Sequence, residues 1–434
     1  MVAAVFVGLL ALSVALASEP SGAASSAQSV VVDLGATRQR ISGFGTSTRV
    51  WSDPHLAKSG NVYVPPEGQR EVLAAIQRVG LTRIRPVLDT GVQKQPGGPF
   101  DFSGKLGDDH VAFVKQARAY GMRVAFPGPV YLEGWMRADD PGSYVEWALR
   151  MLLRFREKGV ELALYAPLNE PEIAGDFPPE WLRQVVVQLG RRMRSVGLDT
   201  KLVVPDDENP VDAYERAAAV LSDPEARRYV GAVAFHIYRN VNPTTLTRLR
   251  RLATAYGLEL WMTEYNSKTY TDWRSSVDWG VKMHELLTVG SVNAIDYLFA
   301  FFGNWVGDTT LVRMDFENGR YRGYGLTSLY WITGQYSRFV RPGDVRVAAT
   351  PASGEVLVSA YRGRGRVTVV AINPSSRQQA LRARIVRGGV SRFVAHVRSS
   401  ASERWRALPP PRLLGSRFAA TLPPESITTF VLAR

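Results

Sequence analysis

The chain has 434 residues, 45% of them hydrophobic, enough for one large globular domain with a smaller one attached. It contains no cysteine, which excludes disulfides, thiolate metal sites and cysteine nucleophiles. The formal net charge of +13 lies entirely in residues 338–434, which hold 17 Arg and four acids, so the rest of the chain is neutral overall.

The N-terminal 17 residues form an apolar stretch that is too short to span a bilayer with margin. Because Ala15 and Ala17 place small residues at both cleavage-site positions, we predict a secretory signal peptide over residues 1–17. Residues 18–28 are rich in Ser, Ala and Gly and are predicted to form a flexible leader. We therefore expect a secreted protein without stable membrane insertion.

From residue 29 the pattern changes to short apolar runs. Residues 29–36 are predicted to form an N-terminal strand, and residues 41–46 begin a regular alternation of strands and helices. Further strands are predicted at 81–88, 122–127, 162–168, 201–205, 230–236, 258–264 and 292–300, and helices at 67–79, 108–120, 141–158, 179–196, 211–221, 243–256, 272–289 and 323–333.

Several of these helices end in a glycine that also leads into the next strand, as Gly197 and Gly257 do. Eight such units over residues 37–337 predict a (β/α)₈ TIM barrel. A doubly wound open sheet is the rival, but no Gly-rich phosphate motif follows the first strand.

After residue 333 the helical period disappears. Short strands separated by Gly, Pro and Ser turns predict an antiparallel β-sandwich over residues 338–434, docked closely on the barrel. These strands are expected at 345–349, 356–361, 367–373, 380–386, 392–396, 417–422 and 428–432.

Functional groups of a (β/α)₈ barrel collect where its strands end. Two features distinguish these positions here: an excess of aromatic residues, and a pair of glutamates after the fourth and seventh strands, which face each other across the barrel mouth. The full set is Arg85, Trp135, Asn169, Glu170, Asp206, His236, Tyr238, Glu264, Phe301 and Trp305.

Two carboxylates about 5 Å apart suit a retaining glycosidase, with one as general acid/base and the other as nucleophile. Burial and a neighbouring charge would keep the acid protonated, whereas a cation such as Arg85 would keep the nucleophile ionised. Exposed Trp and Tyr rings suit the apolar C–H faces of sugars, and Asn169 is placed to bond a sugar hydroxyl.

The chain resembles glycoside hydrolase family 30 over nearly its whole mature length. The stretches that carry the resemblance are 41–45 (Ile-Ser-Gly-Phe-Gly), 134–137 (Gly-Trp-Met-Arg), 169–172 (Asn-Glu-Pro-Glu), 236–238 (His-Ile-Tyr), 261–265 (Trp-Met-Thr-Glu-Tyr), 336–343 (Tyr-Ser-Arg-Phe-Val-Arg-Pro-Gly), 358–361 (Val-Ser-Ala-Tyr), 370–373 (Val-Ala-Ile-Asn) and 426–430 (Ser-Ile-Thr-Thr-Phe).

The resemblance implies that Glu170 is the acid/base and Glu264 the nucleophile. It also implies that Tyr238 lies near the nucleophile, that Trp135 lines the pocket for the glycone sugar, and that the N-terminal strand joins the sandwich. The glucuronoxylanase branch of the family carries an Arg-rich Tyr-Gly segment in the last barrel loop, but residues 301–313 lack it, and Arg313 is the cation available there for an anionic sugar.

Other interpretations stay open at several positions. Arg85 fits a structural ion pair as well as a substrate contact, and Trp305 and Phe301 fit packing under the last loop as well as substrate binding. His236 is more typical of a structural hydrogen bond than of a proton carrier. The acidic run 206–208 is interpreted as a solvated loop, with the alternative that one of its residues lies at the edge of the cleft. With five His and no His-x-x-x-His pair, neither a metal nor a cofactor is expected.

The expected function is a secreted retaining β-glycosidase that cleaves a polysaccharide, preferably with a xylan-type backbone. The predicted substrate contacts are Asn169, Arg85, Trp135, His236, Tyr238 and Trp305. β-1,6-Glucan, β-1,6-galactan and a glucosylceramide-like substrate are alternatives, as is a catalytically silent carbohydrate-binding protein. The basic C-terminal region indicates either an Arg-rich composition or an anionic wall polymer as partner, and no nucleic-acid motif accompanies it.

Overall fold

The computed structural model of the protein describes residues 27–86, 91–102, 108–124, 129, 132–175, 177–351 and 355–434. The predicted signal peptide and residues 18–26 of the predicted leader lie outside these ranges. In the described chain no helix is long and apolar enough to cross a membrane.

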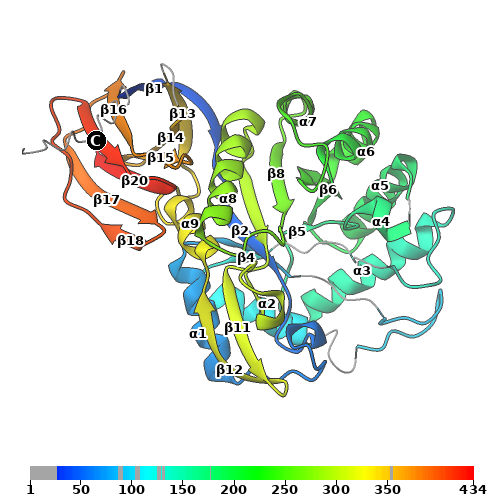
Figure 1. Cartoon of the computed structure of the whole chain (residues 1–434). Coiled ribbons are helices and arrows are strands. Elements are labelled where there is room, and N and C mark those ends of the chain that lie inside the picture. The colour runs from blue at the N-terminus through cyan, green and yellow to red at the C-terminus, as the bar shows by residue number, and fades with distance from the viewer. Residues whose placement is uncertain are drawn as a thin grey trace, which may run out of the picture.

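Eight parallel strands form the barrel-shaped sheet at the centre of the larger domain, and helices surround it (Figure 1). This confirms the predicted (β/α)₈ fold. In the described residues the hydrogen-bonded order is β4-β3-β2-β9-β8-β7-β6-β5. The strands are β2 (Gly43–Thr48), β3 (Arg83–Pro86), β4 (Arg123–Val124), β5 (Leu164–Tyr165), β6 (Lys201–Asp207), β7 (Val230–His236), β8 (Glu259–Glu264) and β9 (Ala294–Leu298).

Several helices begin or end at recognisable local signals. Asn242 and Asp272 form capping boxes at the starts of their helices, and Gly197 and Gly257 take left-handed φ values of 71° and 67° just after helix ends. The helices are α1 (Pro66–Arg78), α2 (Asp108–Ala119), α3 (Pro141–Glu157), α4 (Pro171–Gly175), α5 (Pro179–Ser195), α6 (Pro210–Ser222), α7 (Pro243–Ala255), α8 (Trp273–Glu285) and α9 (Ser328–Ser337).

One buried cluster on the barrel strands consists mainly of small residues around one indole. Ala232, Ala234 and Ala294 pack with Trp261 in a separate buried cluster. The guanidinium of Arg83 stacks 4.0 Å from the ring centre of Trp261 and makes two hydrogen bonds, of 3.0 and 2.9 Å, to Asp296. This pair neutralises two buried charges that would otherwise be costly inside the barrel.

The smaller domain is one curled, mostly antiparallel sheet of nine described strands, in the order β18-β17-β20-β15-β14-β13-β1-β16-β19. The N-terminal strand β1 joins it before the chain enters the barrel and pairs in parallel with β16. The short strand β18 was not predicted. The strands are β1 (Gln28–Arg40), β13 (Val345–Pro351), β14 (Leu357–Gly363), β15 (Arg366–Asn373), β16 (Gln379–Val386), β17 (Arg392–Ser400), β18 (Glu403–Ala407), β19 (Arg417–Leu422) and β20 (Ser426–Ala433).

Helix α9 docks the two domains on each other. The Trp405 ring packs on Tyr330 and Trp331, and its indole N–H donates to the carbonyl of Trp331 at 2.8 Å. Gly334 lies beneath this ring, and a Cβ there would come within 2.1 Å of it. Gln335 donates to Ser399 at 2.8 Å, so polar contacts also join the domains.

The start of the predicted helix at 323–333 is wrong. Residues 320–326 form β12 (Arg320–Leu326), which pairs with β11 (Val312–Glu317), and β10 (Phe301–Gly303) completes a three-stranded sheet. Gly323 takes a φ of 153° here, a conformation that a helix does not allow, so α9 begins only after Thr327.

Candidate active site

Glu170 lies between β5 and α4, at the mouth of the barrel. Its backbone takes a left-handed φ of 47°, and its N–H donates to the carbonyl of Asp206 at 3.0 Å. Pro171 then starts α4, for which its fixed φ is suited. The side chain is only 8% exposed, so a carboxylate is buried at this turn, where it requires polar partners.

Glu264 is the last residue of β8 and is 9% exposed. Arg85 Nη1 donates to its Oε2 at 2.8 Å, and the Tyr238 hydroxyl donates to its Oε1 at 3.0 Å. Burial alone would raise the pKa of Glu264, but the positive charges of His236 and Arg85 and these hydrogen bonds hold it below its usual value.

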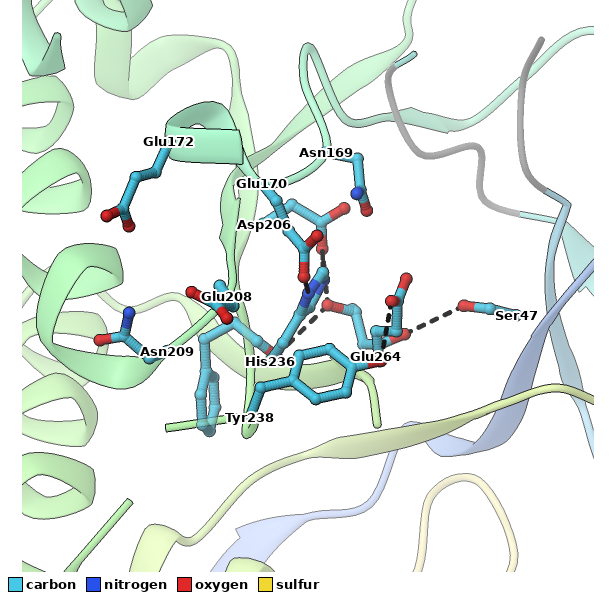
Figure 2. A network of polar contacts seen from close by, with 12 residues as sticks. Ser47, Asn169, Glu170, Glu172, Asp206, Glu208, Asn209, His236, Tyr238 and Glu264 are labelled. Carbon is cyan, nitrogen blue, oxygen red and sulfur yellow. Dashed lines mark hydrogen bonds and ion pairs between the residues drawn. The ribbon is translucent and has the colours of Figure 1, made fainter. Parts of the chain in front are cut away.

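The two carboxylates converge, as the strand positions predicted. One oxygen of Glu170, one oxygen of Glu264 and one ring nitrogen of His236 all lie within 4.8 Å of one another, and Figure 2 shows these side chains meeting. This separation is close to the roughly 5 Å of retaining glycosidases and shorter than the ~6.5–9.5 Å that leaves room for a water in inverting ones.

Arg85 organises the site from beneath. Nη1 donates to Ser47 at 2.6 Å as well as to Glu264, and Nη2 donates to Asn169 at 2.5 Å and to Asp206 at 2.7 Å. Both terminal nitrogens of Arg85 are therefore occupied by protein acceptors. The same contact aligns the amide of Asn169, whose oxygen points to Arg85.

His236 connects the acid pair to the buried part of the site. Its Nδ1 lies 2.7 Å from Glu170 Oε1, and its Nε2 lies 3.4 Å from Asp206 Oδ1. Burial lowers the pKa of His236, but the charges of Glu264, Asp206 and Glu170 outweigh it and raise the pKa to about 10. The imidazole is therefore cationic at neutral pH and supplies a second positive charge beside the glutamates.

The interpretation as a solvated loop is wrong for Asp206 and Asp207. Asp206 and Asp207 are 1% and 0% exposed and end strand β6. Asp206 accepts from Arg85 and from Thr263 (2.6 Å); burial raises its pKa, but Arg85 and His236 hold it well below the usual range. Asp207 pairs with Arg216 at 3.0 Å, and burial raises its pKa to about 7.

Sequence reasoning also missed Ser47, whose hydroxyl accepts from Arg85. The position of Ser47 near the end of the first barrel strand was the available signal, since the other partners of Arg85, namely Asn169, Asp206 and Glu264, also lie at or after the ends of barrel strands. All residues of the acidic run carry a carboxyl group, so the sequence does not tell the buried Asp206 from Glu208. Glu208 pairs with the half-exposed Arg239.

Tyr238 and Trp305 lie on the wall of one open pocket of about 580 Å³. Trp305 is 49% exposed, and its indole N–H donates to the carbonyl of His55 at 3.0 Å, so the ring is held in place while one face stays accessible. The remaining lining residues are Asn266, Lys268, Thr271, Phe299, Val306 and Thr309.

Three further positions named from the sequence, Trp135, Phe301 and Arg313, contact other groups of the protein. Trp135 is half-buried and donates to the carbonyl of Gln93 at 2.9 Å, and among the described residues it is not part of this pocket wall. Phe301 is fully buried and stacks on Trp51 at 4.5 Å, so it packs the core. Arg313 is paired with Asp308 (2.7 Å) and Asp315 (3.3 Å).

Glu170, His236 and Glu264 offer three potential metal ligands within 4.8 Å. Their surroundings do not suit a cation, because Arg85 donates directly to Glu264 and the imidazole of His236 is itself protonated. A metal ligand must present a lone pair, whereas a cationic imidazole has none to offer. The arrangement suits two carboxyl groups that act on the same bond.

No protein-family model matches the chain. Glucuronoxylanase XynC of Bacillus subtilis (strain 168) is 28% identical over 312 residues, covering 69% of this chain and 68% of that protein. Endo-1,6-beta-D-glucanase neg1 of Aspergillus fumigatus is 23% identical over 320 residues, covering 69% of this chain and 59% of that protein.

Among solved structures, a family 30 endoxylanase from Clostridium papyrosolvens C71 has the same fold, with a TM-score of 0.74 and 22% identity over 94% of this chain and 100% of that one. The fold, the order of the motifs along the sequence and these relatives agree. The chain is similar to family 30 glycoside hydrolases in fold and to the two curated relatives in sequence, and these likenesses support membership of that family of retaining O-glycosyl hydrolases.

Proposed function

We propose that the protein cleaves a β-linked polysaccharide by double displacement, with Glu264 as nucleophile and Glu170 as general acid/base. The observation that carries the proposal is the approach of the two carboxylates to within 4.8 Å, with different partners on each. Glu264 accepts from Arg85 and Tyr238, whereas Glu170 faces His236.

In the first step, the ionised Glu264 attacks the anomeric carbon while the glycosidic C–O bond breaks. Glu170 gives its proton to the departing sugar oxygen, so the leaving group departs as a neutral alcohol. Arg85 keeps Glu264 anionic until the new ester bond forms, and Tyr238 holds the carboxylate in position for attack.

In the second step, Glu170 takes a proton from water while the water oxygen attacks the anomeric carbon and the ester bond breaks. Glu264 leaves as a carboxylate, and Glu170 is protonated again, so both groups return to their starting states. Glu264 carries no charge while it is esterified, so the water approaches Glu170 without a second carboxylate beside it.

The two variants Glu264→Gln and Glu170→Gln test these roles with an aryl glycoside that has a good leaving group. Glu264→Gln should abolish hydrolysis, whereas Glu170→Gln should still form the glycosyl-enzyme and release a burst of phenol. Hydrolysis retained by Glu264→Gln contradicts the proposal. Polysaccharide binding by the wild type without any release of reducing ends would favour the silent carbohydrate-binding alternative.

For the substrate we propose a xylan-type backbone, supported by the glucuronoxylanase of Bacillus subtilis. Arg313 already forms ion pairs with two aspartates, so it is not a free cation for an acidic side group of the substrate. The proposal therefore does not require such a side group on the xylan. β-1,6-Glucan is the second candidate, because the Aspergillus relative is named as a glucanase of that linkage.

A comparison of hydrolysis rates on a panel of polymers distinguishes these substrates. Xylan, glucuronoxylan, β-1,6-glucan, β-1,6-galactan and a glucosylceramide should be incubated with the wild type and with Glu264→Gln as the blank. Release of xylo-oligosaccharides at the highest rate supports the xylan proposal, and a higher rate on any other polymer contradicts it.

We also propose that the protein is exported and meets this polymer outside the cell, supported by the apolar stretch 1–17 and the small residues Ala15 and Ala17. N-terminal sequencing of the protein from the culture medium of its host tests this. A mature chain that begins near residue 18 is expected, and a chain retained in the cell with residues 1–17 intact contradicts it.

A further inference from the structure

One edge of the side sheet carries a basic groove that the barrel chemistry does not use. A hollow of about 520 Å³ lies over β1, β16 and β19, and we call it the arginine groove. Four arginines and two exposed apolar side chains define it: Arg382, Arg384, Arg412, Arg417, Val31 and Leu414. In Figure 1 strand β16 lies at the upper left, away from the barrel helices.

The strand register places like charges directly opposite each other. Arg382 and Arg384 alternate with buried residues on β16, so both point to solvent on one face. Arg384 pairs across the ladder with Arg417 on the edge strand β19. Two like charges in this position repel and destabilise the sheet, and an anion bound between them would remove that cost.

Within the described side sheet the acidic side chains form ion pairs with basic residues outside the groove. Each of its five carboxylates lies within 4.0 Å of a basic group elsewhere, whereas no ion pair involves the four groove arginines among the described residues. The pairs are Asp33–Arg387, Asp344–Arg366, Glu355–Arg377, Glu403–Arg398 and Glu425–Arg274. The local charge of the groove is therefore not neutralised by the protein itself.

The floor of the groove favours a polysaccharide over a nucleic acid. Val31 and Leu414 are 42% and 59% exposed and present aliphatic surface, which suits the C–H faces of sugar rings. Single-stranded nucleic acid binds by stacking its bases on exposed aromatic rings, and the aromatic ring of this groove, Phe418, is only 4% exposed. Guanidinium groups match carboxylates with paired hydrogen bonds.

We propose that the arginine groove is a second, non-catalytic binding site for an acidic polysaccharide whose sugars carry carboxylates. The groove lies on strands that take no part in the barrel. It holds the polymer through paired guanidinium–carboxylate contacts from Arg384 and Arg417, and through aliphatic contact with Val31 and Leu414.

Binding of the full-length protein to polygalacturonate, measured by affinity electrophoresis or calorimetry, tests the proposal. The variant Arg384→Gln/Arg417→Gln is compared with Arg364→Gln/Arg392→Gln, which removes the same charge at two exposed arginines of the side sheet outside the groove. The groove variant should bind about five- to thirtyfold more weakly, since each partly exposed ion pair contributes modestly. The control variant should bind like the wild type.

Thermal unfolding separates a binding defect from a folding defect. Because the groove variant loses a like-charge repulsion, its Tm should equal or exceed that of the wild type. Dextran, a neutral polymer, should not bind. Equal loss of binding in both variants, a lack of binding by the wild type, or tighter groove-dependent binding of polyphosphate or poly(dT) than of polygalacturonate would each overturn the proposal.

Discussion

Arg85 Nη1 donates a 2.8 Å hydrogen bond to Glu264 Oε2, and both side chains are nearly excluded from solvent. The contact joins β3 to β8 across the barrel mouth. A cation fixed at this distance in a buried site favours the ionised carboxylate far more than it would in water. The charge state that a nucleophile requires is thus set by a residue from another strand.

Replacing Arg85 with Gln should raise the pKa of Glu264. The acidic limb of the kcat/KM profile reports ionisation of the nucleophile, so it should move to higher pH, and kcat at the optimum should fall about ten- to hundredfold because a hydrogen bond between charged groups is lost. The profile of Tyr238→Phe, which removes only a neutral donor, should move in the same direction by less. An acidic limb that stays in place in both variants would disprove this role of Arg85.

Much of this site could be predicted because it follows from local pattern. The alternation of apolar runs and helix-ending glycines such as Gly197 gave the strand count, and the count placed Glu170 and Glu264 on opposite strands. Neither inference requires knowing a distant contact. The regular alternation of strands and helices along the chain, together with the identity of these two glutamates, was sufficient.

The buried contacts around the glutamates could not be predicted, because they depend on residues that are distant in the sequence. Asp206 sits among three consecutive acids, and a solvated loop is the ordinary environment of such a run. It is buried because Arg85 and Thr263, from two other strands, supply its partners, and side-chain convergence of this kind leaves no periodic signal. Likewise β12 contains Tyr321 and Tyr324, which favour a strand, but also Gly323 and Gly325, which weaken one, so its pairing with β11 is what identifies it as a strand.

The buried imidazole of His236 should make stability depend on pH. Its pKa is raised to about 10 in the fold from 6.5, so the folded protein binds the proton more tightly than the unfolded chain. The resulting stabilisation is fully present below pH 6.5 and is lost as the pH rises through about 10. The gap in free energy of unfolding between the wild type and His236→Gln should therefore be constant below pH 6.5 and shrink toward pH 10. Urea denaturation across this range measures it, and a gap that widens with pH would contradict the assignment.

The stability of the fold should depend strongly on the buried ion pair between Arg83 and Asp296. Asp296→Asn leaves the guanidinium of Arg83 buried at 4% exposure without its counter-charge, and should lower the free energy of unfolding by about 3–5 kcal/mol. Glu146→Gln breaks a pair with Arg192 in which both side chains are at least half exposed, and should cost under about 1 kcal/mol. Equal effects in denaturant titrations of these two variants would show that burial does not control the cost.

Trp305 should contribute to substrate binding without taking part in the chemistry. Its ring is half exposed on the pocket wall, and its indole N–H is anchored to His55, so Trp305→Ala removes a preformed apolar face. Loss of an interaction that is equally strong in the ground state and the transition state raises KM and leaves kcat unchanged. KM on the polysaccharide should therefore rise about five- to thirtyfold. Tyr256→Ala, at an exposed aromatic ring at the end of α7 and outside this pocket, is the matched control and should leave both constants unchanged. A fall in kcat with unchanged KM in Trp305→Ala would instead place the ring in contact with the reacting sugar.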